Sequence, residues 1–288
     1  MINKILWASD DSGDSNEILK YVELFDSKFN VEILGLYVIP DYPEKKIGGE
    51  LTTEQSDRFI KWVKDTESEE KKRLREIATD FKKKGIDFGV EIVKGIPHRE
   101  ILRVAETEKA DLIALGKGKH IEKFILGGTA VRVLRQSSIP ILTARESRQK
   151  KADIRRILVP LDISHGLPKS LKYAVELSKR LDAEIYLLNI VEVGEYGFPP
   201  EVVERVRELS FRGITENIGR PRIEDNVETF VEVAENPWVG IVKFVREKDI
   251  DLIVMMTFGD TRFRGGFIGS TAEKVIQEAP CPVIAMRP

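Results

Sequence analysis

The sequence predicts a duplicated α/β fold with two tandem doubly wound domains. Each domain is expected to have a five-stranded parallel sheet in the order 3-2-1-4-5, and a pseudo-two-fold axis is expected to relate the two. Two observations predict it. First, segments of one half recur in the other, as when Lys4–Ser12 is repeated by Arg156–Ser164 and Ala110–Ile113 by Ile250–Ile253. Second, each half alternates short apolar runs with amphipathic stretches, the pattern of parallel strands covered by helices on both faces.

The elements are clearest in the second half, where five short apolar runs predict five strands. These are Ile157–Leu161, Glu184–Val191, Val227–Val233, Asp251–Met256 and Pro282–Ala285. Helical periodicity between them predicts four helices, the first with Leu171, Ala174, Val175 and Ser178 on one face and the others around Glu201–Ile218, Val239–Lys248 and Thr271–Glu278.

The first half repeats this order with a longer helix from Thr53 to Lys84. In its charged part we expect Leu74, Ile77, Ala78 and Phe81 to be buried and the charges to face water, with a partner surface as the alternative. The polar stretch 145–153 is expected to be the linker, which places the domains at 1–146 and 153–288. A length of 288 residues suits two domains of ordinary size.

Composition excludes several classes of protein. Acidic and basic residues nearly cancel, with a formal charge of -2, so no basic surplus is available to attract nucleic acid or an anionic membrane. No apolar run approaches the roughly 20 residues of a membrane-spanning helix. The single cysteine, Cys281, excludes an internal disulfide and fits a cytoplasmic protein, where we expect it to pack as a small hydrophobic residue.

In the predicted strand order the chain reverses direction between strands 1 and 4, and ligands of doubly wound folds bind in the crevice at that point. Pro160 and Asp162 end the first strand of the second half. The Asp162 carboxylate can accept a hydrogen bond from an adenine amino group or a ribose hydroxyl, and a turn or helix-capping role fits its position equally well.

A glycine-rich loop follows strand 4 of the second half and leads into the last helix. Amide groups and the positive end of a helix dipole favour phosphate at such a place. The loop supplies glycines without a Cβ, two hydroxyls and two arginines, namely Gly259, Gly269, Ser270, Thr271, Arg262 and Arg264. The arginines are equally compatible with solvated loop charges, and a glycine-rich loop alone is more often a flexible connection.

With these motifs the chain resembles the universal stress protein family. The resemblance rests on Ile157–Asp162, Asp251–Val254, the helix start Gly269–Lys274 and the ending Ala279–Ile284, and it covers both halves. It implies the doubly wound fold and, in ATP-binding members, a Gly-x2-Gly-x9-Gly-(Ser/Thr) motif after strand 4. It also implies that the fifth strands, Pro140–Thr143 and Pro282–Ala285, pair within one molecule as an internal dimer, and two such chains could associate further.

The second half carries most of that motif, since Gly259 and Gly269 are separated by nine residues and followed by Ser270. Met256 stands at the first glycine position, where it is expected to narrow the pocket, so that AMP or ADP fits as well as ATP. By resemblance Asp162 would hold the adenine or ribose and Val191 would line the base pocket.

The first half departs further and is expected to be a degenerate site or to be occupied differently. It keeps Asp10, Ile39, Gly116, Gly127 and Thr129, whereas Lys119 replaces the second glycine and Gly128 stands in the position of Ser270. Lys117, Lys119 and His120 offer positive charge to a ligand there. The turn Ser9–Ser15 is expected to cap the first helix.

The leading expectation is a regulatory protein that binds an adenine nucleotide (ATP, ADP or AMP, with or without Mg²⁺), mainly in the second domain, and is not an enzyme. The alternatives are a slow ATP hydrolase using Asp260 and a scaffold that has lost nucleotide binding. The chain lacks a Walker A motif, and His98, His120 and His165 are scattered without metal-ligand spacing.

Overall fold

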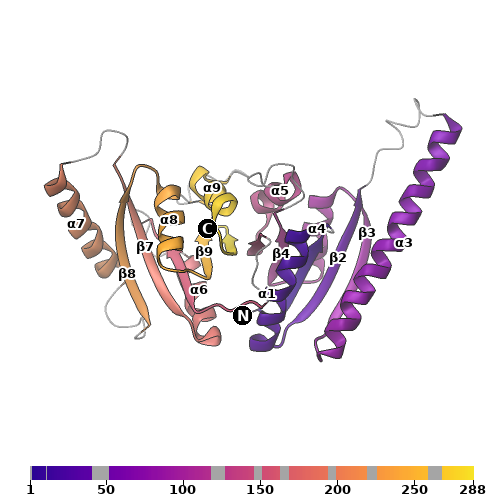
Figure 1. Ribbon diagram of the computed structural model, residues 1–288, viewed down its shortest axis with the longest axis horizontal. Coiled ribbons are helices and arrows are strands. Elements are labelled where there is room, and N and C mark those ends of the chain that lie inside the picture. Colours follow the sequence, from indigo (N-terminus) through magenta and orange to yellow (C-terminus); the bar gives the residue numbers. More distant parts are fainter. Residues whose placement is uncertain are drawn as a thin grey trace.

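The computed structural model shows an α/β molecule with a single long sheet (Figure 1). The residues that it describes are 2–10, 12–40, 52–117, 127–145, 151–162, 169–193, 199–218, 226–258 and 268–288. In these residues no helix has a stretch that is both long enough and apolar enough to cross a membrane.

Each half contains five strands alternating with helices, as the sequence predicts. The first half runs β1 (Lys4–Ser9), α1 (Gly13–Phe29), β2 (Glu32–Pro40), α3 (Thr53–Lys83), β3 (Phe88–Gly95), α4 (Pro97–Thr107), β4 (Leu112–Gly116), α5 (Gly128–Gln136) and β5 (Ile141–Ala144). The second half runs β6 (Arg156–Pro160), α6 (Lys169–Leu181), β7 (Glu184–Glu192), α7 (Pro200–Ile218), β8 (Val227–Ala234), α8 (Pro237–Glu247), β9 (Leu252–Met256), α9 (Ser270–Glu278) and β10 (Val283–Met286).

The strands form one ten-stranded sheet in the order β3-β2-β1-β4-β5-β10-β9-β6-β7-β8. Each half therefore has the predicted order 3-2-1-4-5 with parallel neighbours, and the two halves meet where β5 pairs antiparallel with β10. At the centre of this pairing Leu142 lies opposite Ile284, its own counterpart in the repeat. Such self-pairing is what a two-fold relation requires, and it confirms the expected pairing of the fifth strands.

Helices cover both faces of the sheet, and each face has a hydrophobic core that runs through both halves. Ile18, Leu74 and Leu171 belong to the core beneath α1, α3 and α6. On the opposite face α4, α5, α8 and α9 enclose a second core. Because the inner strands β4, β5, β9 and β10 are buried from both sides, they are apolar along nearly their whole length, whereas the edge strands β3 and β8 are only partly buried and carry glutamates.

The duplication extends to individual hydrogen bonds. In the first half Asp111, just before β4, accepts the backbone N–H groups of Asn3 and Lys4 at 2.7 and 3.1 Å. Asp251 does the same in the second half for Arg155 and Arg156, at 2.9 and 3.0 Å. In each half a carboxylate thus fixes the start of the first strand against the start of the fourth.

The two halves differ most at the outer ends of the molecule, where α3 and α7 lie (Figure 1). Helix α3 has 31 residues and α7 has 19. Leu74, Ala78 and Phe81 of α3 are buried against the sheet and Ile77 packs beside them, as expected. The first half of α3 projects past the strands, and Trp62 in this part is 49% exposed.

Candidate functional site

A pocket of about 400 Å³ lies at the carboxyl ends of β1, β2 and β4 in the first half, at the expected reversal point. The starts of α4 and α5 close it from the side. It brings together five of the residues expected at the degenerate site: Asp10, Gly116, Gly127, Gly128 and Thr129. Residues far apart in the sequence therefore form one site because parallel strands end at the same edge.

Asp10 enters the pocket directly after β1 and is held by the start of α1. Its Oδ1 accepts hydrogen bonds from the backbone N–H of Ser12 at 3.0 Å and from the Ser12 hydroxyl. Ser12 is the N-cap of α1, where its hydroxyl oxygen accepts the N–H of Ser15 at 3.1 Å. The expected capping turn is confirmed, and it orients the Asp10 carboxylate at the pocket.

Helix α5 presents its amino end to the pocket. Its N-cap is Gly127, which has no side chain to accept the amide groups of the first turn. The Gly127 N–H donates to the Lys117 carbonyl at 2.7 Å and closes the loop at its base. Among the described residues, a Cβ on Gly128 would meet no heavy atom within 4 Å, so there is space beside the first residue of the helix. Such a helix start is suited to an anion.

Apolar side chains form the rest of the pocket wall. Leu36 and Val38 come from β2, Leu115 from β4 and Ile101 from α4. Ile39 is buried but is not among the lining residues, because side chains alternate along β2 and turn Val38, not Ile39, to this face. The sequence analysis did not predict that a residue of α4 lines the pocket. The amphipathic pattern of 97–107 is the signal that could have revealed it.

Gly116 lines the pocket, but its lack of a side chain is needed on the other face of the sheet. A Cβ there would lie 2.6 Å from the backbone nitrogen of Ser15 and 2.9 Å from the carbonyl carbon of Asp14. The start of α1 thus packs directly on β4. In this structure the glycine is explained by helix packing, whereas the sequence pattern placed it only at the first glycine position of the ATP-binding motif.

Lys117 differs from the sequence-based expectation that it offers charge to a ligand. Its side chain is only 3% exposed and does not line the pocket. Lys119 and His120 lie outside the described residues.

The second half repeats the framework of the site. The exposed Asp162 follows Pro160 and Leu161 at the end of β6, and the buried Asn189 donates to the Leu161 carbonyl at 3.0 Å. Gly269 is the uncapped N-cap of α9, and its N–H donates to the Thr257 carbonyl at 2.8 Å, as Gly127 does to Lys117. Ser270 and Thr271 form the first turn of α9. Gly259, Arg262 and Arg264 lie outside the described residues.

Two side chains of the second half point differently from the expectation. Met256 packs against the core beneath α6, on the face opposite α8 and α9, so its side chain does not narrow the crevice on the α8 side. On β7, Ile190 faces Gly240 of α8, since a Cβ on that glycine would lie 2.8 Å from the Ile190 Cδ1. Val191 is the next residue and therefore points to the other face.

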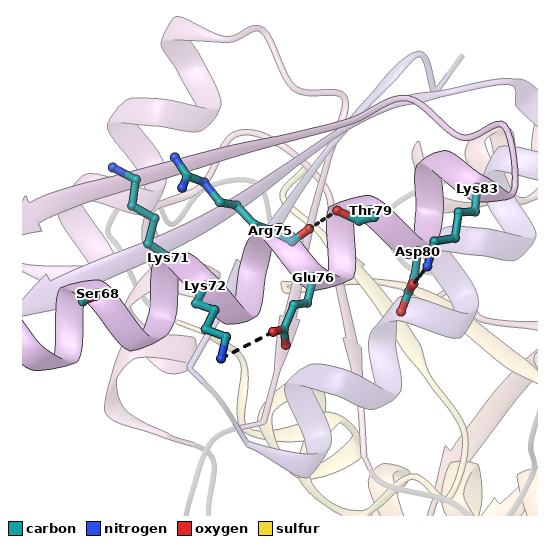
Figure 2. Close-up of a pocket in the computed structure, with 8 residues that line it drawn as sticks. All are labelled: Ser68, Lys71, Lys72, Arg75, Glu76, Thr79, Asp80 and Lys83. Atoms are coloured by element: carbon teal, nitrogen blue, oxygen red, sulfur yellow. Dashed lines mark hydrogen bonds and ion pairs between the residues drawn. The ribbon is translucent and has the colours of Figure 1, made fainter.

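A larger hollow, about 600 Å³, lies on the outer face of α3 (Figure 2). All eight lining residues come from this one helix, and Figure 2 shows their side chains fanning out along it. Lys72 pairs with Glu76 at 4.0 Å and Lys83 with Asp80 at 2.9 Å. One helix cannot enclose a ligand, so the smaller pocket between strands and helices is the candidate site.

Cys281 packs against the core on the α8 and α9 side. Burial raises the pKa of its thiol to about 12, so the thiol stays protonated at neutral pH. This behaviour fits the expected small hydrophobic residue.

Comparison with known proteins shows where this architecture recurs. The model of the universal stress protein family matches residues 1–145 and again 153–287. A universal stress protein of Methanocaldococcus jannaschii is 32% identical over 140 residues, which cover 46% of this chain and 82% of the relative. A universal stress protein of Synechocystis is 26% identical over 303 aligned positions, covering 99% of this chain and all of the relative.

Among solved structures, a universal stress protein of Archaeoglobus fulgidus superposes with a TM-score of 0.73 at 25% identity. The match covers 100% of this chain and 99% of that one, so the tandem arrangement is shared along the whole length. With a family match in each half and the doubly wound sheet in both, this chain belongs to the universal stress protein family.

Proposed function

We propose that the chain binds an adenine nucleotide in the first-half pocket and in the corresponding crevice of the second half. The observation that carries the proposal is the composition of the pocket in the first half. One carboxylate, one uncapped helix start and an apolar wall converge on a space of about 400 Å³. That volume lies within the range of small-molecule sites.

Each part of the pocket suits one part of a nucleotide. The Asp10 carboxylate, fixed by Ser12, can accept a hydrogen bond from a ribose hydroxyl or an adenine amino group. The wall of Leu36, Val38 and Ile101 suits the flat apolar base. The amide groups of the first turn of α5 and the Thr129 hydroxyl suit a phosphate.

The second half supports a second site of the same chemistry. Asp162 and the start of α9 occupy the positions of Asp10 and the start of α5. Its Gly-x9-Gly-Ser spacing is closer to the motif of ATP-binding family members than that of the first half. We propose a regulatory role, in which bound nucleotide stabilises the conformation that it binds better. Incubation with labelled ATP and Mg²⁺ should therefore yield no phosphate above the rate without protein.

Calorimetric titration of ATP and of adenosine into the nucleotide-free chain tests the proposal. Asp10→Ala should weaken the first site about tenfold or more for both ligands, because a hydrogen bond to a charged group is lost. Asp162→Ala should do the same at the second site and leave the first unchanged. Thr129→Val should weaken ATP and spare adenosine. Wild-type protein that binds neither ligand at millimolar concentration would refute the proposal.

A further inference from the structure

Lys117, the residue that follows β4, is a buried amine at the centre of the molecule. It is 3% exposed, and within the described part of the chain its Nζ has no hydrogen-bond partner. An ammonium group held away from water without a partner is costly, so such a lysine tends to lose its proton on folding. The nucleotide site as described above makes no use of this side chain.

Lys117 lies beside the seam between the two halves, meaning β5, β10 and the adjoining residues Arg145 and Cys281. The residue before it, Gly116, pairs with Ala144 of β5. The charged and titratable groups that act on it come from four elements: Asp14 at the start of α1, Arg145 after β5, Glu278 at the end of α9, and Cys281 before β10. Two of these four belong to the other half of the chain.

The other half provides a comparison, since Thr257 occupies the position of Lys117 there. Both residues accept a loop hydrogen bond at their carbonyl oxygen, from Gly127 to Lys117 and from Gly269 to Thr257. Thr257 is 1% exposed, and its hydroxyl likewise has no partner among the described residues. The position is thus buried in both halves, but only the first half places an ionisable group there.

We propose that Lys117 makes the seam sensitive to protons. When the amine is neutral, β5 and β10 pack tightly together. Uptake of a proton puts an uncompensated charge beside the seam and loosens the packing between the halves. The proposal concerns the seam between the two halves and does not depend on nucleotide binding.

The charges around Lys117 set the pH range. Burial lowers the pKa of its amine from 10.5 to about 7, and the positive charge of Arg145 acts in the same direction. Cys281, Asp14 and Glu278 oppose this shift. Since the unfolded chain holds the proton more tightly, stability is greatest above the unfolded pKa. It falls as the pH decreases from about 10.5 towards 7 and is constant below that.

Denaturant unfolding of wild type, Lys117→Met and Lys117→Thr between pH 6 and 10 tests whether protonation of the Lys117 amine destabilises the chain. Lys117→Thr installs the residue found at the equivalent position, and Lys72→Met on the exposed face of α3 is the control. Between pH 10 and 7 the unfolding constant of wild type should rise on the order of 100-fold more than that of either Lys117 variant. Parallel curves for wild type and the Lys117 variants would overturn the proposal.

Amide hydrogen exchange of the wild type locates the effect without any variant. After correction for intrinsic rates, protection of 141–145 and 281–286 should fall at least tenfold relative to β2 as the pH is lowered from 9.5 to 7. In Lys117→Thr this loss should disappear. Equal changes of protection in the seam and in β2 would contradict a local effect at the seam, because they would mean that the proton destabilises the whole chain uniformly.

Discussion

Gly116 and Gly128 both line the first-half pocket, but an added side chain would meet different surroundings at the two positions. Gly116 packs on the backbone of α1, whereas a Cβ on Gly128 would meet no atom of the described residues within 4 Å. Gly116→Ala should therefore destabilise the ligand-free chain by about 2 kcal/mol, the usual cost of overpacking. Gly128→Ala, at the first position of α5, should be neutral or stabilise by up to about 0.5 kcal/mol.

Denaturant unfolding of the two ligand-free variants measures this difference. The variants form a matched pair, since each adds one methyl group to a glycine that lines the same pocket. If Gly116→Ala were as stable as Gly128→Ala, the close packing of α1 on β4 would be refuted.

Single residues are also where prediction from the sequence reached its limit. The sequence indicated Asp10, Gly127 and Thr129 as one group, because strand ends and helix starts can be located from apolar runs and glycines. It did not indicate which way Met256 and Ile39 point, since one step along a strand reverses the face. Nor did it reveal the burial of Lys117, which depends on packing between the two halves.

At the scale of elements, α3 combines two regions of different stability. Its start has a capping box formed by Thr52 and Gln55, which stabilises the helix end locally. Yet no residue with a described side chain between 52 and 73 is buried, whereas Leu74, Ala78 and Phe81 are packed on the sheet. Tertiary packing supplies most of the stability of a helix, so the two regions should open separately.

Hydrogen exchange along α3 should therefore show much lower protection in 56–68 than in 74–83. Thr52→Ala, which removes a cap contributing about 1 kcal/mol, should lower protection in the first region and leave the second unchanged. Uniform protection along the whole helix would contradict this division.

The elements themselves were predictable. All five strands expected in the second half are present within one residue of their expected ends, because each coincides with a short run of mostly apolar residues. The long helix was expected at Thr53–Lys84 and is observed at Thr53–Lys83. Its projection past the sheet was not foreseen, since a periodic pattern predicts a helix but not what lies beside it.

At the scale of the molecule, the antiparallel pairing of β5 with β10 turns two domains into one sheet. Separated halves would each expose an apolar edge strand, which favours pairing with another chain. Fragments 1–146 and 153–288 made apart should therefore self-associate, and when mixed they should form a one-to-one complex. Light scattering after size exclusion measures this. Fragments that stay monomeric alone and in mixture would contradict the role of the seam.

The central claim is that the carboxyl edge of the first-half sheet holds an adenine nucleotide. Hydrogen exchange of the full chain with and without saturating ATP tests it most directly. We predict increased protection at 8–10, 36–40, 115–116 and 127–130, segments that border the pocket. Unchanged exchange in all four segments, with ATP present in excess, would contradict the claim.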